Sequence, residues 1–205
     1  MSTNQGGRGA SSTDLRICVI GDELAAGQGD GRGLGWVGRV VARTRTDPPP
    51  FVAVLAVPGE DSVGLSARWE AETERRFSPN GENRLVIGLG ATDITHGISL
   101  ARSRLNLANI LDAAAAKRVQ SFVVGPPPHP EVDADRTEEL SNAYADVCFR
   151  RRVPYVETFA SLRAHEQWLA DFAEGGTHPG QAGYGLLAWL VLHHGWARWI
   201  GSTEG

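Results

Sequence analysis

Five short apolar runs, each bounded by glycine or proline, constrain the fold of this chain more than any other feature. They are rich in Val, Ile and Leu without strict alternation, which is typical of strands buried on both faces. The runs are LRICVI (15–20), FVAVLAV (51–57), RLVIGLG (84–90), SFVVGPPP (121–128) and VPYVET (153–158). Segments with helical spacing lie between them, for example Leu107, Ile110, Leu111 and Ala114, and later Leu187, Leu190, Val191 and His194. This alternation predicts an α/β fold with a parallel sheet covered by helices on both faces.

Length and charge narrow the class of protein further. The chain has 205 residues, of which 41% are hydrophobic, so we expect one domain over residues 15–200 with disordered tails at 1–14 and 201–205. The formal net charge of -4 disfavours a nucleic-acid partner, because phosphate binding requires a basic surface. The polar N-terminus lacks the apolar core of a signal peptide, and no window reaches the roughly 18 apolar residues of a membrane span. We therefore expect a cytoplasmic protein without a membrane span.

The loops that follow the five predicted strands are the expected location of the functional site, because ligands of such sheets bind at the carboxyl ends of the strands. These loops are GDE (21–23), GEDS (59–62), GATD (90–93), GPPPHP (125–130) and EGGTHPGQAGY (174–184). His178 lies in the last of them, just before the final helix. His129 has proline on both sides, so we expect it in a rigid, solvent-facing turn.

Two other features carry less functional information. GLGWVG (33–38) has the glycine spacing of a dinucleotide fingerprint, but about a dozen residues separate it from the preceding strand. We expect a loop there, followed by a helix with Trp36 and Val40 on its inner face, and we predict no cofactor. Cys18 and Cys148 are expected to be buried thiols rather than a disulfide or a metal pair.

Taken together, the strand-end loops resemble the sequence blocks of the SGNH/GDSL hydrolase family. Gly-Asp-Glu-Leu at 21–24 is similar to the family's Gly-Asp-Ser-Leu, and Gly59 matches the glycine of the second block. Gly-Ala-Thr-Asp at 90–93 matches Gly-x-Asn-Asp, and the stretch from Gly175 to Pro179 matches Asp-x-x-His-Pro. The resemblance covers roughly residues 15 to 197. It implies a flavodoxin-like three-layer α/β/α sandwich with five parallel strands in the order 2-1-3-4-5, and descent from an esterase or acylhydrolase acting on carboxyl or acetyl esters.

The catalytic residues that the resemblance implies are only partly present. In the family, serine attacks the ester carbonyl, histidine accepts its proton, aspartate orients the histidine, and backbone and asparagine N–H groups hold the oxyanion. This chain keeps Gly59 and His178 but has Glu23 for the serine, Thr92 for the asparagine and Gly175 for the aspartate. These replacements remove the ordinary acyl-enzyme route, because triad members act as a unit.

Two functions therefore remain open from the sequence. The first is an atypical ester hydrolase that uses Glu23 or Ser62 with His178, oriented by Glu174 or Asp171. The second is a pseudoenzyme that binds a small ester or acyl ligand, or a protein partner, in the old crevice. Either function uses the strand-end groups as oxyanion or ligand-binding residues, and these are Gly59, Thr92, Asp22 and Asp93.

Glu23 itself has three interpretations at this stage. Its carboxylate could fill the anion-binding hole, accepting hydrogen bonds from the Gly59 or Thr92 loops or pairing with protonated His178. It could instead act as a general base or nucleophile, although Asp22 and Asp93 would raise its pKa. Thirdly, Asp22, Glu23, Asp93 and His178 could bind a divalent ion, but no ligand-spacing motif is present and we predict no metal.

Overall fold

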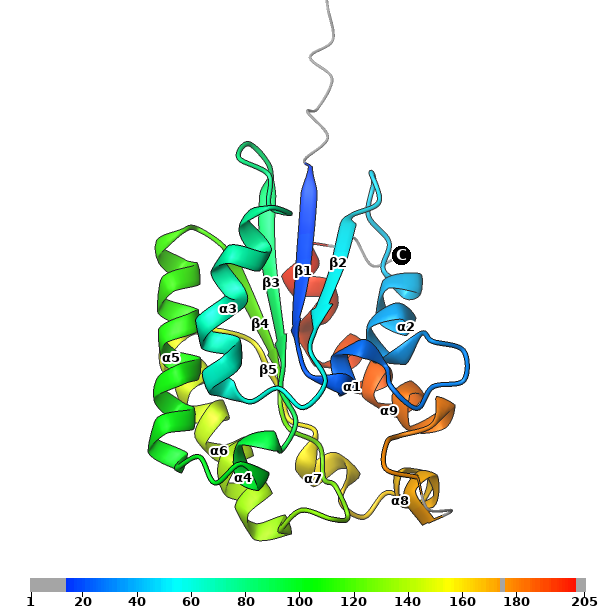
Figure 1. Ribbon diagram of the computed structural model, residues 1–205. Coiled ribbons are helices and arrows are strands. Elements are labelled where there is room, and N and C mark those ends of the chain that lie inside the picture. The colour runs from blue at the N-terminus through cyan, green and yellow to red at the C-terminus, as the bar shows by residue number, and fades with distance from the viewer. Residues whose placement is uncertain (1–13, 174–175, 202–205) are drawn as a thin grey trace, which may run out of the picture.

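The computed structural model describes residues 14–173 and 176–201, and its centre is a five-stranded parallel sheet. The strands lie in the order β2-β1-β3-β4-β5 (Figure 1), as the sequence analysis expected. They are β1 (Leu15–Gly21), β2 (Phe51–Ala56), β3 (Glu82–Gly88), β4 (Gln120–Val124) and β5 (Tyr155–Val156). The predicted tails lie almost entirely outside the described residues.

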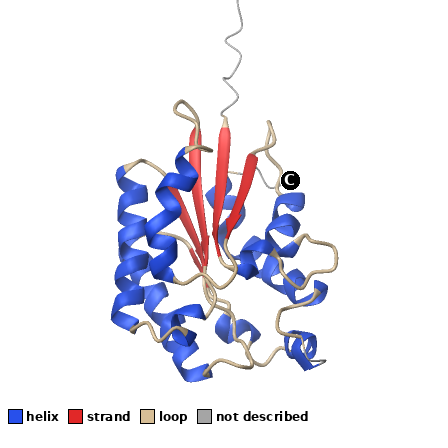
Figure 2. Ribbon diagram, in the orientation of Figure 1, coloured by secondary structure: helices blue, strands red, loops and turns tan. Residues whose placement is uncertain are grey.

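Helices cover both faces of the sheet, which makes the fold a three-layer α/β/α sandwich (Figures 1 and 2). One face carries α3 (Ser62–Glu74), α5 (Leu100–Ala116) and α6 (Ala134–Arg151). The other carries α2 (Gly35–Arg43), α9 (Gln181–Val191), the π-helix η1 (Leu192–Trp196) and α10 (Ala197–Ile200). Short helices follow the carboxyl ends of the strands, namely α1 (Glu23–Ala26), α4 (Thr92–Thr95), α7 (Phe159–Leu162) and α8 (Glu166–Ala173).

The core is divided by the sheet into two apolar clusters. Val19 and Val86 pack with α2 and α9, whereas Ile20 and Ile87 pack with α3 and α5. Neighbouring residues of one strand thus face opposite layers, and all four are at most 1% exposed. This burial on both faces explains why the strands read as continuous apolar runs.

The predicted inner faces of the helices are confirmed with one exception. Trp36 and Val40 are buried on α2, and the predicted apolar positions of α5 are buried as well. The prediction that His194 continues the apolar face of the last helix is wrong. The helix is broken at His194 and Gly195 (φ 96°), and the His194 side chain is exposed.

Both cysteines are buried free thiols, as expected. Burial raises the pKa of Cys18 to about 11 and that of Cys148 to about 12, so neither thiol is reactive at neutral pH. Within residues 14–173 and 176–201, no helix combines the length and apolar character needed to cross a membrane.

Candidate functional site

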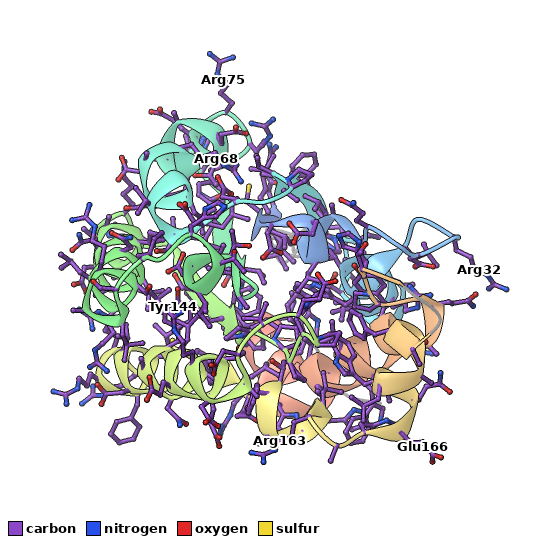
Figure 3. The ribbon with its side chains drawn as sticks, turned by 60° about the horizontal axis from the view of Figure 1, so that its bottom comes forward. Arg32, Arg68, Arg75, Tyr144, Arg163 and Glu166 are labelled. Atoms are coloured by element: carbon purple, nitrogen blue, oxygen red, sulfur yellow. The ribbon has the colours of Figure 1, made fainter. Side chains whose placement is uncertain are left out.

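A crevice of about 220 Å³ lies at the carboxyl edge of the sheet, the side that is turned forward in Figure 3. Its walls come from the loops after β1, β3 and β4, from α8 and from the loop before α9. The fold therefore brings together Glu23, Thr92 and His178, which are far apart in the sequence. Leu24, Val132, Trp168 and Phe172 make part of the wall apolar.

Glu23 is the first residue of α1, and its carboxylate reaches across to the loop after β2. The Gly59 N–H donates to Glu23 Oε2 over 2.6 Å. Gly59 has a φ of 71°, a conformation that side-chain-bearing residues rarely adopt. The expected contact between Glu23 and the Gly59 loop is confirmed, and this N–H already has a negatively charged acceptor.

The Gly59 loop is anchored by a buried ion pair next to it. Glu60 is 7% exposed and accepts a hydrogen bond from Arg68 Nε of α3 over 2.6 Å. Arg68 also donates to the Leu55 carbonyl over 2.8 Å, so it joins the loop to the end of β2. The Glu60 carboxylate raises the pKa of Arg68, which therefore stays charged. These contacts fix the position at which the Gly59 N–H is presented.

Asp22 is fully buried and ties two loops together instead of lining the crevice. It caps α1 by accepting from the Leu24 N–H over 3.0 Å, and its other oxygen accepts from the Gly90 N–H. Burial, assisted by the charge of Glu23, raises the pKa of Asp22 to about 7. The expectation that Asp22 contacts a ligand is not supported by this position.

Asp93 and Ser62 form a buried network behind the crevice. Asp93 accepts from the Ser62 N–H over 2.7 Å and from the Tyr144 hydroxyl over 3.2 Å. Ser62 has no exposed surface, and its Oγ accepts from Asn106 Nδ2 over 2.9 Å. Ser62 therefore does not face the crevice as an alternative nucleophile would, and Asp93 supports the loops instead of contacting a ligand.

Two members of this network were missed from the sequence. Tyr144 of α6, labelled in Figure 3, and Asn106 of α5 are both buried polar side chains. Burial and the charge of Asp93 hold the pKa of Tyr144 well above its usual range, so its hydroxyl remains a donor. Asn106 directly precedes Leu107 on the buried face of its helix, and a polar residue on such a face was the available signal.

His178 is partly exposed at the rim of the crevice. Its Nδ1 lies 2.8 Å from Thr177 Oγ1. The loop after α1 packs against it, because a Cβ built on Gly29 (φ 92°) would lie only 2.7 Å from the His178 Cβ. Glu23 and His178 line the same crevice, but in the described part of the chain no hydrogen bond or ion pair joins them.

The carboxylate expected to orient His178 is not found among the described residues. Glu174 and Gly175 lie outside them. Asp171 caps the start of α9 instead, because its Oδ2 accepts from the Gly180 N–H over 2.8 Å and from the Gly183 N–H over 2.7 Å. Asp171 therefore positions the helix that follows His178, not the imidazole.

His129 is a second imidazole in the crevice wall, which corrects the expected solvent-facing turn. Its Nε2 lies 3.1 Å from the Thr177 carbonyl oxygen, and its ring centroid lies 5.2 Å from that of Phe172. His129 is half-buried, and its ring packs edge-on against Phe172 of α8. His129 thus connects the loop after β4 to the loop that carries His178.

The arrangement offers a fixed carboxylate, two imidazoles and an apolar wall. Asp22 and Asp93 are engaged by backbone N–H groups, and within the described ranges no three ligand-type side chains are grouped so that they could hold a metal ion. The third interpretation of Glu23, as one of four metal ligands, therefore has no geometric support.

Comparison with known proteins agrees with this architecture. A family model described as the GDSL-like lipase/acylhydrolase family matches residues 19–186. The fold is similar to that of the psychrotrophic esterase EstA from Pseudoalteromonas sp. (17% identity, TM-score 0.72, 92% of this chain and 100% of the esterase). It is also similar to the lipase/acylhydrolase from Enterococcus faecalis (21% identity, TM-score 0.71, 90% of this chain and 96% of that protein). A further similar structure is Axe2, an acetylxylan esterase from Geobacillus stearothermophilus (18% identity, TM-score 0.71, 94% of this chain and 97% of the esterase). A comparison with curated protein sequences gave no match.

Proposed function

Because the chain belongs to the GDSL-like lipase/acylhydrolase family, we propose that its crevice binds a small ester- or acyl-bearing ligand without forming an acyl-enzyme. The observation that carries this proposal is the 2.6 Å hydrogen bond from the Gly59 N–H to the Glu23 carboxylate. The protein is then a binding protein built on an esterase fold.

The contact of Glu23 with Gly59 opposes ester hydrolysis in two ways. The Gly59 N–H, expected from the family resemblance to stabilise the oxyanion, is engaged by the Glu23 carboxylate. Loss of one such donor lowers the rate by about 10²–10³-fold, and a carboxylate beside the reacting carbonyl would also repel the developing negative charge. Ser62 offers no replacement, since its hydroxyl is buried and bonded to Asn106.

The walls of the crevice suit a short acyl group. Leu24, Val132 and Phe172 supply apolar surface, while Thr92 and Thr95 supply hydroxyl groups at the two ends of the short helix α4. A volume of about 220 Å³ admits a small ligand only. Pockets of this kind use apolar surface for affinity and a few polar groups for orientation.

Binding is tested by titration calorimetry with 4-nitroacetanilide, an amide isostere of p-nitrophenyl acetate. We expect binding to the parent, loss of binding in Val132→Arg, which fills the crevice, and unchanged binding in Leu169→Arg. Leu169 is the matched control because it lies on α8, is 48% exposed and does not line the crevice. Absence of binding to the parent would contradict the proposal.

Turnover is tested with p-nitrophenyl acetate and an organophosphonate that labels activated serines. We expect no hydrolysis above that of the His178→Ala variant, and no serine modified by the reagent in mass spectrometry. Labelling of any serine together with His178-dependent turnover would contradict a binding-only protein.

A second candidate function is hydrolysis in which Glu23 acts as general base for water. It is favoured by one observation: Glu23 Oε1 accepts no hydrogen bond in the described part of the chain, so one oxygen remains free beside the crevice. This function predicts turnover that is lost in both Glu23→Gln and His178→Ala and that survives the organophosphonate. The binding-only proposal predicts no turnover to lose.

A further inference from the structure

A second cavity lies at the opposite end of the sheet from the crevice, where β4 begins. It has a volume of about 780 Å³ and is bordered by the end of α5, the first residues of β4, the segment before β5 and the start of α10. In Figure 1 the strands begin at the end of the molecule that is far from α4, α7 and α8. Leu111, Val119 and Val153 give this cavity apolar walls.

Three arginines and no acidic residue line the cavity. They are Arg118, Arg152 and Arg198, all exposed. Within the described ranges none of the three guanidinium groups makes a hydrogen bond or an ion pair. Some arginines elsewhere are paired, as Arg68 is with Glu60 and Arg151 with Asp112, whereas the exposed Arg75 has no partner among the described residues. The cavity therefore concentrates positive charge without an internal counter-charge.

Two of these arginines occupy backbone positions that favour glycine. Arg118 follows the end of α5 with φ 59°, and Arg152 ends α6 with φ 57°. Among the described residues they are the two non-glycine residues with positive φ. A helix usually ends with glycine in this conformation, because a side chain there is strained. The chain keeps arginine at both strained positions, and both side chains border the cavity.

Buried polar groups without partners also surround the cavity. Ser121 and Trp199 line it and are 7% and 8% exposed, yet Ser121 Oγ and Trp199 Nε1 have no partner in the described residues. Arg84, 5% exposed, stacks over the Trp199 ring with its guanidinium carbon 5.2 Å from the ring centroid. Arg84 pairs with Glu82 through one nitrogen, while its Nε and the other terminal nitrogen have no partner. Buried polar groups are ordinarily hydrogen-bonded, so these donors are available to a polar ligand or to water.

The short length of β5 leaves this part of the sheet open. β5 pairs with β4 only from Val123 onward, so no strand of the described chain lies beside β4 at Ser121 on that side. The sheet edge, the three arginines and the donors Ser121 Oγ and Trp199 Nε1 therefore lie around one cavity. The arginines are positively charged, and the other groups can donate hydrogen bonds. None of these residues lines the crevice.

We propose that this cavity binds a small organic anion, a carboxylate with an apolar body. The carboxylate accepts hydrogen bonds from the guanidinium groups of Arg118, Arg152 and Arg198, since planar guanidinium matches carboxylate geometry. The apolar body packs on Leu111, Val119 and Val153. The site is independent of the proposed crevice function, because the two cavities share no lining residue.

The proposal is tested by titration calorimetry of the full chain with sodium octanoate, with octanamide as the uncharged control ligand. We expect one octanoate per chain and at least tenfold weaker binding of octanamide. In the double variant Arg118→Gly and Arg152→Gly the octanoate dissociation constant should rise at least tenfold. The thermal midpoint should not fall, because glycine relieves the strained backbone at both positions.

Two further variants separate site binding from general charge attraction. Arg198→Gln should weaken octanoate binding without altering a strained residue, whereas Arg75→Gln should leave it unchanged. Arg75 is an exposed arginine that projects from the end of α3 into solvent (Figure 3). Absence of octanoate binding, binding that persists in the double variant, or equal weakening by Arg75→Gln would each overturn the proposal.

Discussion

The two sides of the crevice are held in different ways. The carboxylate side is made of the loops after β1 and β3, with the loop after β2 behind them. It is fixed by Asp22, Glu23 and Asp93, each of which accepts a hydrogen bond from a backbone N–H of another loop. The histidine side, made of His129, Thr177 and His178, is held by exposed contacts between neighbouring side chains and one carbonyl group. Glu23 thus lies on the side held by backbone N–H contacts, where its carboxylate becomes part of the support of the loops.

This difference implies that substitutions on the carboxylate side cost stability, whereas those on the histidine side mainly change the imidazole. Buried hydrogen-bond networks are expensive to leave half satisfied, and exposed contacts contribute little. Four substitutions test this contrast.

Asp93→Ala should have the largest effect. It leaves the Ser62 N–H and the Tyr144 hydroxyl buried without an acceptor, which costs about 3 kcal/mol of unfolding free energy. The measurement is the urea midpoint followed by circular dichroism. Tyr144→Phe is the partial control and should cost about 1 kcal/mol, because it removes a single donor. A loss below that value for Asp93→Ala would contradict a supporting role for this carboxylate.

Asp22→Asn should change how stability depends on pH. The pKa of Asp22 is about 7 in the folded protein, above its ordinary value of 3.8, so between these values the folded state binds a proton that the unfolded chain has released. The contribution of Asp22 to stability therefore falls as the pH rises from 4 to 8. The asparagine side chain does not titrate, so the stability of the variant does not fall for this reason as the pH rises.

At pH 5 the Asp22→Asn variant should be the less stable protein, because an amide oxygen cannot serve both the Leu24 and the Gly90 N–H groups well. The difference in thermal midpoint between parent and variant should narrow as the pH rises to 8. A difference that stays constant from pH 5 to 8 would show that Asp22 is ionised throughout.

Gly29→Ala should have an intermediate effect, and it should reach the histidine side. The residue has φ 92°, and a Cβ would lie 2.7 Å from the His178 Cβ, so we expect a loss of about 1–2 kcal/mol and a displaced imidazole. Thermal unfolding measures the first effect, and the NMR signals of the His178 ring measure the second. Gly31→Ala is the matched control in the same loop, since its Cβ would meet nothing within 4 Å.

Thr177→Val should have the smallest effect on stability, less than about 0.5 kcal/mol, because the residue is exposed. It removes the hydroxyl that lies 2.8 Å from His178 Nδ1, so the tautomer balance of the ring should shift. Nitrogen NMR of the ring measures this shift. A cost as large as that of Asp93→Ala would remove the contrast between the two sides.

The contact between Glu23 and Gly59 could be predicted from the sequence, and Ser62, Asp22, Asp93 and His129 could not be placed correctly. The ends of parallel strands meet at one edge, so loops at these ends are neighbours whatever their side chains do. The direction of each side chain depends on its partner from a distant helix. Ser62 turns toward Asn106 of α5, and Asp93 is joined by Tyr144 of α6, while Asp22 is drawn to the Gly90 N–H.

The parallel α/β architecture follows from the sequence alone, because strands buried on both faces must be continuously apolar and their crossovers must be helical. Together with the family resemblance it also predicted which loops meet and that Glu23 stands where the family has its serine. Tertiary structure alone decided which polar groups face the crevice and which support it. It also decided that Arg118, Arg152 and Arg198 converge on one cavity, because they come from three segments that only packing around β4 brings together.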